Sequence, residues 1–430
     1  MSTRFIATGD SFITRRLPEV GYKGFEDLQA LIKSHDVRFA NLEMTFHRYE
    51  AYPAASSGGT WAVTDPVMLD DILHYGFNLF NTANNHSGDF GSLGVTATIK
   101  HLQSRHMVFA GTGHSLQEAS GACYLEVDGL RVALIGATSS FDPAAVAGGQ
   151  GFRMPARPGL NPLRYQTIYH VDKATFDAVK HIEKVSQVNA LHELTIELGY
   201  APPMPDNIAY LGPVNFVLDE RNYVETKPDP RDEERILNEI REAKRQADVV
   251  LFSIHSHEMR GKDFFTIPEF ISTICHKAIE AGASVVLGHG PHMLRGVETY
   301  NGGVILHGLG NFIFQTETIS EQPYDAFAKM GLSQETRVGQ YMDHRSKNGT
   351  VGHVVMPDIW RSFVASWTMD AGRVTEMKLY PIDLGMHKSR AQRGWPSLTD
   401  DVKALEKIQE LSSQLGTTVI IKDGIGYVEF

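Results

Sequence analysis

The sequence is poor in cysteine and contains no long apolar segment. Its 430 residues include two cysteines, Cys123 and Cys275, whose separation matches no metal-binding or redox motif. We interpret both as buried apolar thiols, which suits a reduced cytoplasm. No stretch approaches the roughly 18 apolar residues of a membrane span, and the N-terminal residues MSTRFIATGD lack the apolar run of a secretory signal. We therefore expect a cytoplasmic protein without a membrane anchor.

Positive charge is also scarce. Lysine and arginine number 40 against 51 aspartates and glutamates, which gives a formal net charge of −11. Nucleic acids and anionic membranes both select for clustered basic residues. We therefore expect no nucleic-acid partner, although a locally basic pocket is compatible with this balance.

The first 140 residues alternate short apolar runs with amphipathic stretches. The apolar runs predict strands at 5–8, 37–42 and 77–82, and the amphipathic stretches predict helices at 25–34, 65–75 and 93–105. This alternation is typical of an α/β sheet, in which functional residues follow the carboxyl ends of the strands.

The alternating pattern stops near residue 141 and resumes at residue 231. Residues 141–165 are rich in Gly, Pro and Arg, residues 172–198 have helical apolar spacing, and residues 201–230 are proline-rich and irregular. A charged helix and further strands follow. We predict a core made of residues 1–140 and 231–430, with residues 141–230 inserted into it as a cap over the site.

Five short polar clusters follow or interrupt the apolar strands. They are Gly9-Asp10, Asn41-Leu42-Glu43, Asn84-Asn85-His86, His255-Ser256-His257-Glu258 and Gly288-His289-Gly290-Pro291-His292. Carboxylates, amide oxygens and imidazoles are the ligands of hard and borderline divalent cations. Taken singly, each cluster has an ordinary explanation as a helix cap, a turn or a satisfied core histidine. Five of them in one chain predict a metal site.

The order and the amino-acid sequences of these clusters resemble those of the CapA family (capsule synthesis, poly-γ-glutamate biosynthesis) of the calcineurin-like metallophosphoesterase superfamily. The shared elements are "GD", "NLE", "ANNH" followed by Asp89 and Gly91, a strand-end His, "GHxPH" and "LGNFIF", within residues 5–140 and 248–315. The resemblance implies a calcineurin-like metallophosphoesterase fold, with a two-sheet α/β core flanked by helices and the inserted cap.

The resemblance also implies a ligand set for one or two divalent metal ions, with Mn, Fe, Zn, Mg and Ca all open. That set is Asp10, Glu43, Asn85, His255, His289 and His292. His86 would act as a general acid or stabilise charge, and imidazole suits that work because its unperturbed pKa of about 6.5 lies near neutrality.

Four positions depart from the superfamily pattern. Phe12 replaces the His of the usual "DxH", and Glu43 replaces an Asp; CapA-like proteins share both changes. Gly290 replaces the middle His of "GHHPH" and Ser256 replaces a Trp, and these two changes are particular to this chain. One metal position is therefore short of ligands, which makes a single-ion site an alternative.

Three arginines near residues 158–162 suggest a group that binds substrate. Arg153, Arg157 and Arg164 can each hold a carboxylate or phosphate in two-point fashion. The alternative is that they are solvated or paired with local acids. We expect a small-molecule or peptide-like substrate, with a carboxylate as a candidate for recognition.

Three functions compete. The leading interpretation is a metal-dependent hydrolase of an amide or peptide-like (polyglutamate-like) or phosphoester substrate. The second is a metal-assisted acid/base enzyme such as a peptide epimerase, with His86, His255, His257 and Asp10 as its proton-transfer groups. The third is a non-catalytic accessory in polymer synthesis; CapA proteins in that role usually carry an N-terminal membrane anchor, which makes it the least favoured.

Overall fold

The computed structural model describes residues 2–370 and 372–430, and the chain divides into two compact units. The larger unit comprises the chain up to Leu163, together with Arg231–Ile267 and Cys275–Phe430. The smaller unit comprises Arg164–Pro230 and Pro268–Ile274. Within the described residues, no helix combines the length and apolar character needed to cross a membrane.

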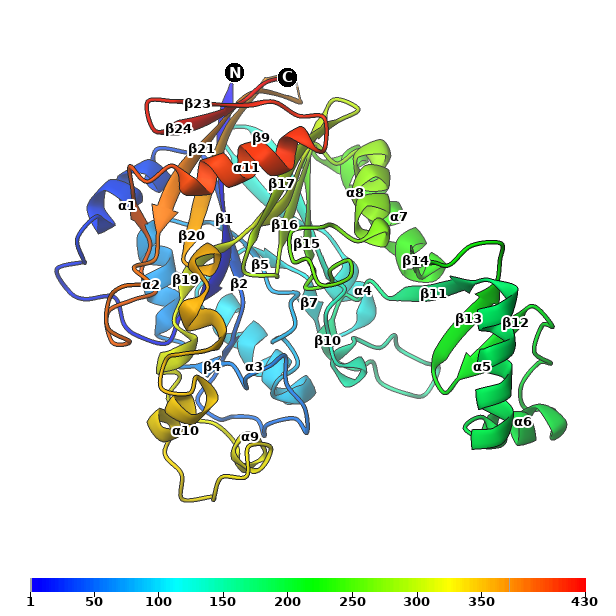
Figure 1. The fold of residues 1–430 in the computed structure, drawn as a ribbon. Helices are drawn as coiled ribbons and strands as arrows, with labels where there is room; N and C mark the ends of the chain where they lie inside the picture. Colours follow the sequence, from blue (N-terminus) through cyan, green and yellow to red (C-terminus); the bar gives the residue numbers. More distant parts are fainter. Residues whose placement is uncertain (1, 371) are drawn as a thin grey trace. The chain divides into compact units, whose positions relative to one another are not determined.

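Two mixed sheets form the larger unit (Figure 1). The first sheet has a parallel centre, which consists of β1 (Thr3–Phe12), β2 (Val37–Leu42), β5 (Leu79–Asn81) and β6 (Phe109–Ala110). Antiparallel strands extend it beyond β1, namely β20 (Arg361–Asp370), β21 (Arg373–Asp383), β24 (Ile425–Val428) and β23 (Val419–Lys422). A short strand, β19 (Asn311–Phe314), also pairs with the end of β1.

The second sheet repeats this plan with four parallel strands in its centre. They are β9 (Leu130–Thr138), β15 (Val249–His255), β16 (Val285–His289) and β18 (Gly303–Leu309). Antiparallel β8 (Cys123–Val127) and β17 (Leu294–Tyr300) form its two edges. The central strands are buried almost throughout, which explains why their sequences are continuous apolar runs rather than alternating ones.

The core lies between the two sheets, and helices cover their other faces. Phe5 and Phe39 of the first sheet share one apolar cluster with Leu251 and Leu287 of the second. On the other face of the first sheet, α1 (Phe25–Lys33) and α2 (Met68–Tyr75) join a separate cluster that includes Phe80. The two-sheet α/β core expected from the sequence is therefore present.

Three further helices of the larger unit bury apolar side chains on one side. α3 (Gly91–Gln103) follows the third cluster, α7 (Pro230–Gln246) buries Ile236 and Ile240, and α11 (Lys403–Ser413) buries Leu405 and Ile408. Both cysteines are free, but only Cys275 is buried; Cys123 is half-buried.

The smaller unit is a four-stranded sheet packed by helices. Its strands are β11 (Tyr165–Val171), β12 (Ile208–Leu211), β13 (Val214–Leu218) and β14 (Tyr223–Pro228), and its helices are α5 (Lys173–Ser186) and α6 (Ala190–Glu197). The proline-rich stretch 201–230 was expected to be irregular but forms three of these strands. The single helical stretch expected at 172–198 is two helices, because Gln187 adopts left-handed backbone geometry.

The boundary of the second unit also differs from the expected insertion. Residues 141–163 belong to the larger unit, where β10 (Gly159–Leu160) pairs with β7 (Thr112–Gly113). Of the expected insertion, only Arg164–Pro230 belongs to the smaller unit. That the insertion covers the site stays a prediction.

Candidate metal centre

The carboxyl ends of the central parallel strands of both sheets carry the predicted residues. In the first sheet, Asp10, Asn41 and Asn81 stand in register on β1, β2 and β5. In the second sheet, His255 at the end of β15 is in register with His289 at the end of β16. Parallel strands present their carboxyl ends at one edge, so clusters far apart in the sequence meet in space.

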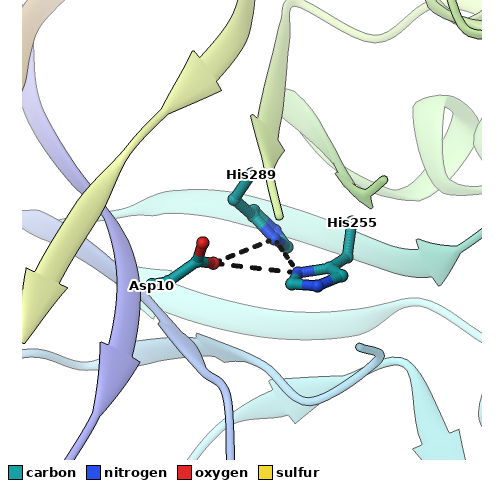
Figure 2. Close-up of side chains that lie close together, drawn as sticks. All are labelled: Asp10, His255 and His289. Carbon is teal, nitrogen blue, oxygen red and sulfur yellow. Dashed lines mark hydrogen bonds and ion pairs between the residues drawn. The ribbon is translucent and has the colours of Figure 1, made fainter. Parts of the chain in front are cut away.

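A first group consists of Asp10, His255 and His289, all of them buried (Figure 2). Asp10 Oδ1 lies 3.7 Å from His255 Nδ1 and 3.6 Å from His289 Nδ1. The two ring nitrogens lie 2.8 Å apart. Figure 2 shows the three side chains pointing toward one another from strands of the two different sheets.

A second group consists of Glu43, His257 and His292. Glu43 Oε1 lies 3.8 Å from His257 Nε2 and 3.7 Å from His292 Nε2. It also lies 3.7 Å from Nε2 of His255, the ring whose Nδ1 faces the first group. His255 therefore stands between the groups and presents one ring nitrogen to each. The side chain of His257 is 31% exposed, which makes it the open side of the site.

The donor set fits a divalent metal. Both carboxylate oxygens of Glu43 are buried, and neither has a hydrogen-bond partner among the residues that the structure describes. Atoms bound to one ion at about 2.0–2.2 Å lie about 2.8–3.6 Å apart at tetrahedral or octahedral angles. The distances from Glu43 Oε1 to the three imidazole nitrogens, 3.7–3.8 Å, are only slightly longer. An ion placed between this buried carboxylate and the three imidazole nitrogens would give the carboxylate the partner that it lacks among the described residues.

Asn85 directs its amide oxygen into this site. Its Nδ2 donates to the carbonyl of Gly58 at 2.9 Å, which leaves Oδ1 facing His255 Nε2 at 2.9 Å. The oxygen is thus placed where it can either accept from that imidazole or face an ion. Its predicted role as a metal ligand stays a prediction.

Neighbouring polar groups orient the candidate ligands. Ser253 Oγ lies 2.7 Å from His289 Nε2, and Asn311 Oδ1 lies 2.8 Å from His292 Nδ1. When these oxygens accept the ring N–H, the opposite nitrogen of each histidine keeps its lone pair for an ion. Asp10 accepts from Asn41 Nδ2 at 2.7 Å and from the Gly290 backbone at 3.1 Å.

His86 is held by a carboxylate rather than by the other histidines. Its Nδ1 lies 2.7 Å from Asp89 Oδ2, and Asp89 also accepts from the backbone N–H groups of Gly58 and Ala62 at 2.9 and 2.7 Å. Phe12, which replaces a superfamily histidine, packs edge-on against the His86 ring at 5.5 Å. The departure at Phe12 thus provides an apolar wall for His86.

Burial and mutual charge set the protonation of the site. Burial and the neighbouring carboxylates of Asp10 and Asp89 raise the pKa of Glu43 well above its ordinary value. Burial also lowers the pKa of His289 to about 4 and, with help from neighbouring histidines, that of His255 well below its usual value. For Asp10, burial raises the pKa, but the hydrogen bond and charge of His292 and the charge of His289 outweigh it and bring the pKa below its usual value. Without an ion, the imidazoles of His255 and His289 are therefore neutral near pH 7, beside the ionised carboxylate of Asp10.

Gly290 and Ser256, the two departures from the superfamily pattern that are particular to this chain, lie against each other. Gly290 has a φ of +125°, and a Cβ there would lie 2.8 Å from the backbone nitrogen of Ser256. Ser256 N donates to the carbonyl of His289 at 2.8 Å. This close approach of two backbones excludes a side chain at position 290, so the middle His of "GHHPH" has no room here.

The sequence-predicted arginines have other contacts. Arg153 lies over the ring of Phe152 at 5.5 Å, and Arg157 Nε donates to the carbonyl of Val146 at 2.9 Å. Arg164 belongs to the smaller unit. Their role in substrate binding stays a prediction.

Sequence reasoning missed several groups of the site. Asn41 and Asn311 lie within the quoted "NLE" and "LGNFIF" segments, but no role was assigned to them. Ser253 gave no signal at all, because a serine inside an apolar strand is unremarkable. His257 was expected only as a proton-transfer group, whereas the structure places it with Glu43 and His292.

Comparison with known proteins places the chain in a family. The model of the family described as bacterial capsule synthesis protein PGA_cap matches residues 4–316. The uncharacterized protein y4sH of Sinorhizobium fredii is 30% identical over 439 residues, which cover 98% of this chain and 92% of that protein. The PGA biosynthesis protein CapA of Bacillus subtilis is 24% identical over 336 residues, covering 77% of this chain and 64% of that protein. The capsule biosynthesis protein CapA of Bacillus anthracis is 24% identical over 244 residues, covering 56% and 41%. These matches confirm the resemblance seen in the motifs: the chain belongs to the bacterial capsule synthesis (PGA_cap, CapA) family.

Proposed function

We propose that this chain is a metal-dependent hydrolase whose two side-chain groups hold one or two divalent ions. The carrying observation is Glu43, a buried carboxylate without a hydrogen-bond partner among the described residues, 3.7–3.8 Å from three imidazole nitrogens. The proposed ligands are Asp10, Glu43, Asn85, His255, His257, His289 and His292. The calcineurin-like arrangement of the fold is part of the same proposal.

A divalent ion in this site would polarise the scissile carbonyl or phosphoryl group and supply hydroxide near neutral pH. The chain's own residues do the rest. Asp89 holds the Nδ1 proton of His86, so Nε2 is the nitrogen that gives a proton to the leaving group. Asn311 and Ser253 fix the tautomers of His292 and His289. The half-exposed face at His257 is where substrate enters.

The names of the relatives support an amide-type substrate. Two relatives are named for capsule and for PGA biosynthesis, and poly-γ-glutamate, the polymer that the motif resemblance implies, joins its units through amide bonds and carries carboxylates. We therefore place polyglutamate-like or other peptide-like amides first, and phosphoesters second. Arg153, Arg157 and Arg164 stay candidates for holding a substrate carboxylate.

Metal analysis followed by a substrate panel tests the proposal. Protein purified without added metal should carry stoichiometric metal, and chelation should abolish turnover of a γ-glutamyl peptide or of a phosphodiester, with recovery on adding one of Mn, Fe, Zn, Mg or Ca. Glu43→Gln should lose metal, whereas the control Glu298→Gln should keep it; Glu298 pairs with His276 and His307 and belongs to neither group. Metal binding without hydrolysis, but with solvent deuterium entering the substrate's Cα position, would favour the epimerase alternative. If the protein binds no metal, the non-catalytic accessory role is the alternative that remains.

A further inference from the structure

A small cavity is lined almost entirely by residues beyond the part of the chain that the family model matches, and one of them packs on the metal centre. Residues 338–355 form α10 (Val338–Arg345) and the 3-10 turn Gly352–Val355, and the family match ends at residue 316. The ring of His353 packs against His292 and against Phe314, with centroids 5.6 Å apart in each case. Trp360 Nε1 donates to the His353 carbonyl at 2.8 Å, which fixes this turn beside the site.

The cavity is small and polar on one side. Its volume is about 150 Å³, and its lining includes Thr316, Glu317, Arg345, Ser346 and His353. At about 30 Å³ per water molecule, this space holds about five waters. That is room for one small polar group of a ligand rather than for a whole substrate.

The charge on the cavity wall favours an anion. Glu317, its acidic residue, is engaged by two arginines: Arg390 Nε lies 3.3 Å from Oε1, and Arg393 pairs with Oε2. Arg345 has no carboxylate partner among the described residues, and its Nη1 donates to the hydroxyl of Thr60. Arg345 is an exposed residue, and its remaining N–H groups are available to a ligand.

We propose that this cavity binds an oxyanion of the substrate, a carboxylate or a phosphate, through Arg345. A guanidinium holds such groups by parallel charge-assisted hydrogen bonds, which fix orientation as well as affinity. Because His353 touches the candidate ligand His292, an anion held here is anchored next to the metal centre, and the adjacent bond of the substrate is directed toward it. The proposal rests on the proposed function for its catalytic meaning, although anion binding can be measured alone.

Isothermal titration of the whole protein with inorganic phosphate and, separately, with glutarate tests the subsite. Each titration is run with metal-loaded and with chelated protein. Arg345→Gln should weaken binding of at least one probe about tenfold or more, the loss expected for a hydrogen bond to a charged group. Arg345→Lys should restore part of it. Lys347→Gln removes the same charge two residues away, from a side chain outside the cavity lining, and should change affinity less than twofold. The probe that responds identifies the oxyanion.

The outcomes separate this proposal from the proposed function. Anion binding that depends on Arg345 in protein without bound metal supports the subsite even if the hydrolase proposal fails. Binding that disappears on chelation but is unchanged in Arg345→Gln means that the anion binds the ion directly, and this overturns the subsite. Equal weakening in Lys347→Gln, or no binding of either probe at millimolar concentration, also overturns it. Melting temperatures within about 2 °C of wild type show that a loss of binding is not a loss of fold.

Discussion

Replacing Glu43 by methionine should separate the stability of the metal-free protein from its capacity to bind an ion. Glu43 is fully buried, and its carboxylate oxygens have no hydrogen-bond partner among the described residues. A buried polar group without a partner costs about 1–3 kcal/mol, and methionine is a flexible apolar side chain of similar length. With chelator present, we expect the free energy of unfolding of Glu43→Met to exceed that of wild type by about 1–3 kcal/mol.

Added metal should make wild type more stable than Glu43→Met, the reverse of the order expected in chelator. Glu43 Oε1 faces His255, His257 and His292 at 3.7–3.8 Å, so its removal takes a central ligand from the site. Wild type should gain about 2.7 kcal/mol when free metal is 100-fold above Kd, and about 4.1 kcal/mol at 1,000-fold. The variant should gain little. A residue that weakens the empty protein and strengthens the loaded one is kept for function rather than for folding.

Urea unfolding followed by tryptophan fluorescence, with chelator and with each candidate metal, measures both effects. Glu298→Met is the matched control. Glu298 lies 2.8 Å from His276 Nε2 and from His307 Nε2, so its removal should destabilise the protein whether or not metal is present. The reasoning is refuted if Glu43→Met is less stable than wild type in chelator, or if it retains the metal content of wild type.

Three further outcomes are expected. His86→Ala should keep most of its metal and its fold but lose about 10²-fold in turnover, whereas His292→Ala should lose metal as well; metal content and turnover on the same samples distinguish them. In metal-free protein the pKa of His289 is about 4, against about 6.5 in the unfolded chain. The unfolded chain therefore binds more protons between these values, and stability should fall as the pH falls through this window by up to about 3 kcal/mol. Urea unfolding at about pH 7 and about pH 4.5 should show a smaller loss for His289→Gln, and equal losses would contradict the assignment. Gly290→Ala should cost about 1–3 kcal/mol, because its Cβ would meet backbone at 2.8 Å; Gly302→Ala, where a Cβ meets no atom within 4 Å, should lower the melting temperature less.

The departures from the superfamily pattern show where motif comparison needed the structure. The sequence identified Phe12, Ser256 and Gly290 as unusual but offered no reason for them. In the structure, Phe12 packs on His86, and Gly290 lies against the Ser256 backbone. The first contact joins positions 12 and 86 and the second joins positions 256 and 290, so neither lies within one local segment and no local pattern encodes them.

Local patterns in the sequence were sufficient to predict the secondary-structure elements named here and to locate the polar clusters. Apolar runs and amphipathic periodicity respond to short-range burial, so the strand at 37–42 and the helix near 25–34 appear at nearly their predicted places. The rule that sites follow the carboxyl ends of parallel strands then indicated the polar clusters, and the CapA resemblance supplied the ligand set, in which Asp10, Glu43, His255, His289 and His292 come together here. Composition misled at 201–230, where proline content hid three short strands.

Only the tertiary structure decided how these side chains combine. The register between β1 and β2 and between β15 and β16 places Asn41 on Asp10 and His255 beside His289. The packing of the two sheets then divides the ligands into two groups with His255 between them. His353, which follows the last shared motif, packs on the candidate ligand His292 and lines a cavity together with Arg345, and no spacing in the sequence indicates these contacts. The physical reason is the same in each case: a periodic pattern reports which face of an element is buried, whereas partners across a sheet or between sheets depend on long-range register and packing.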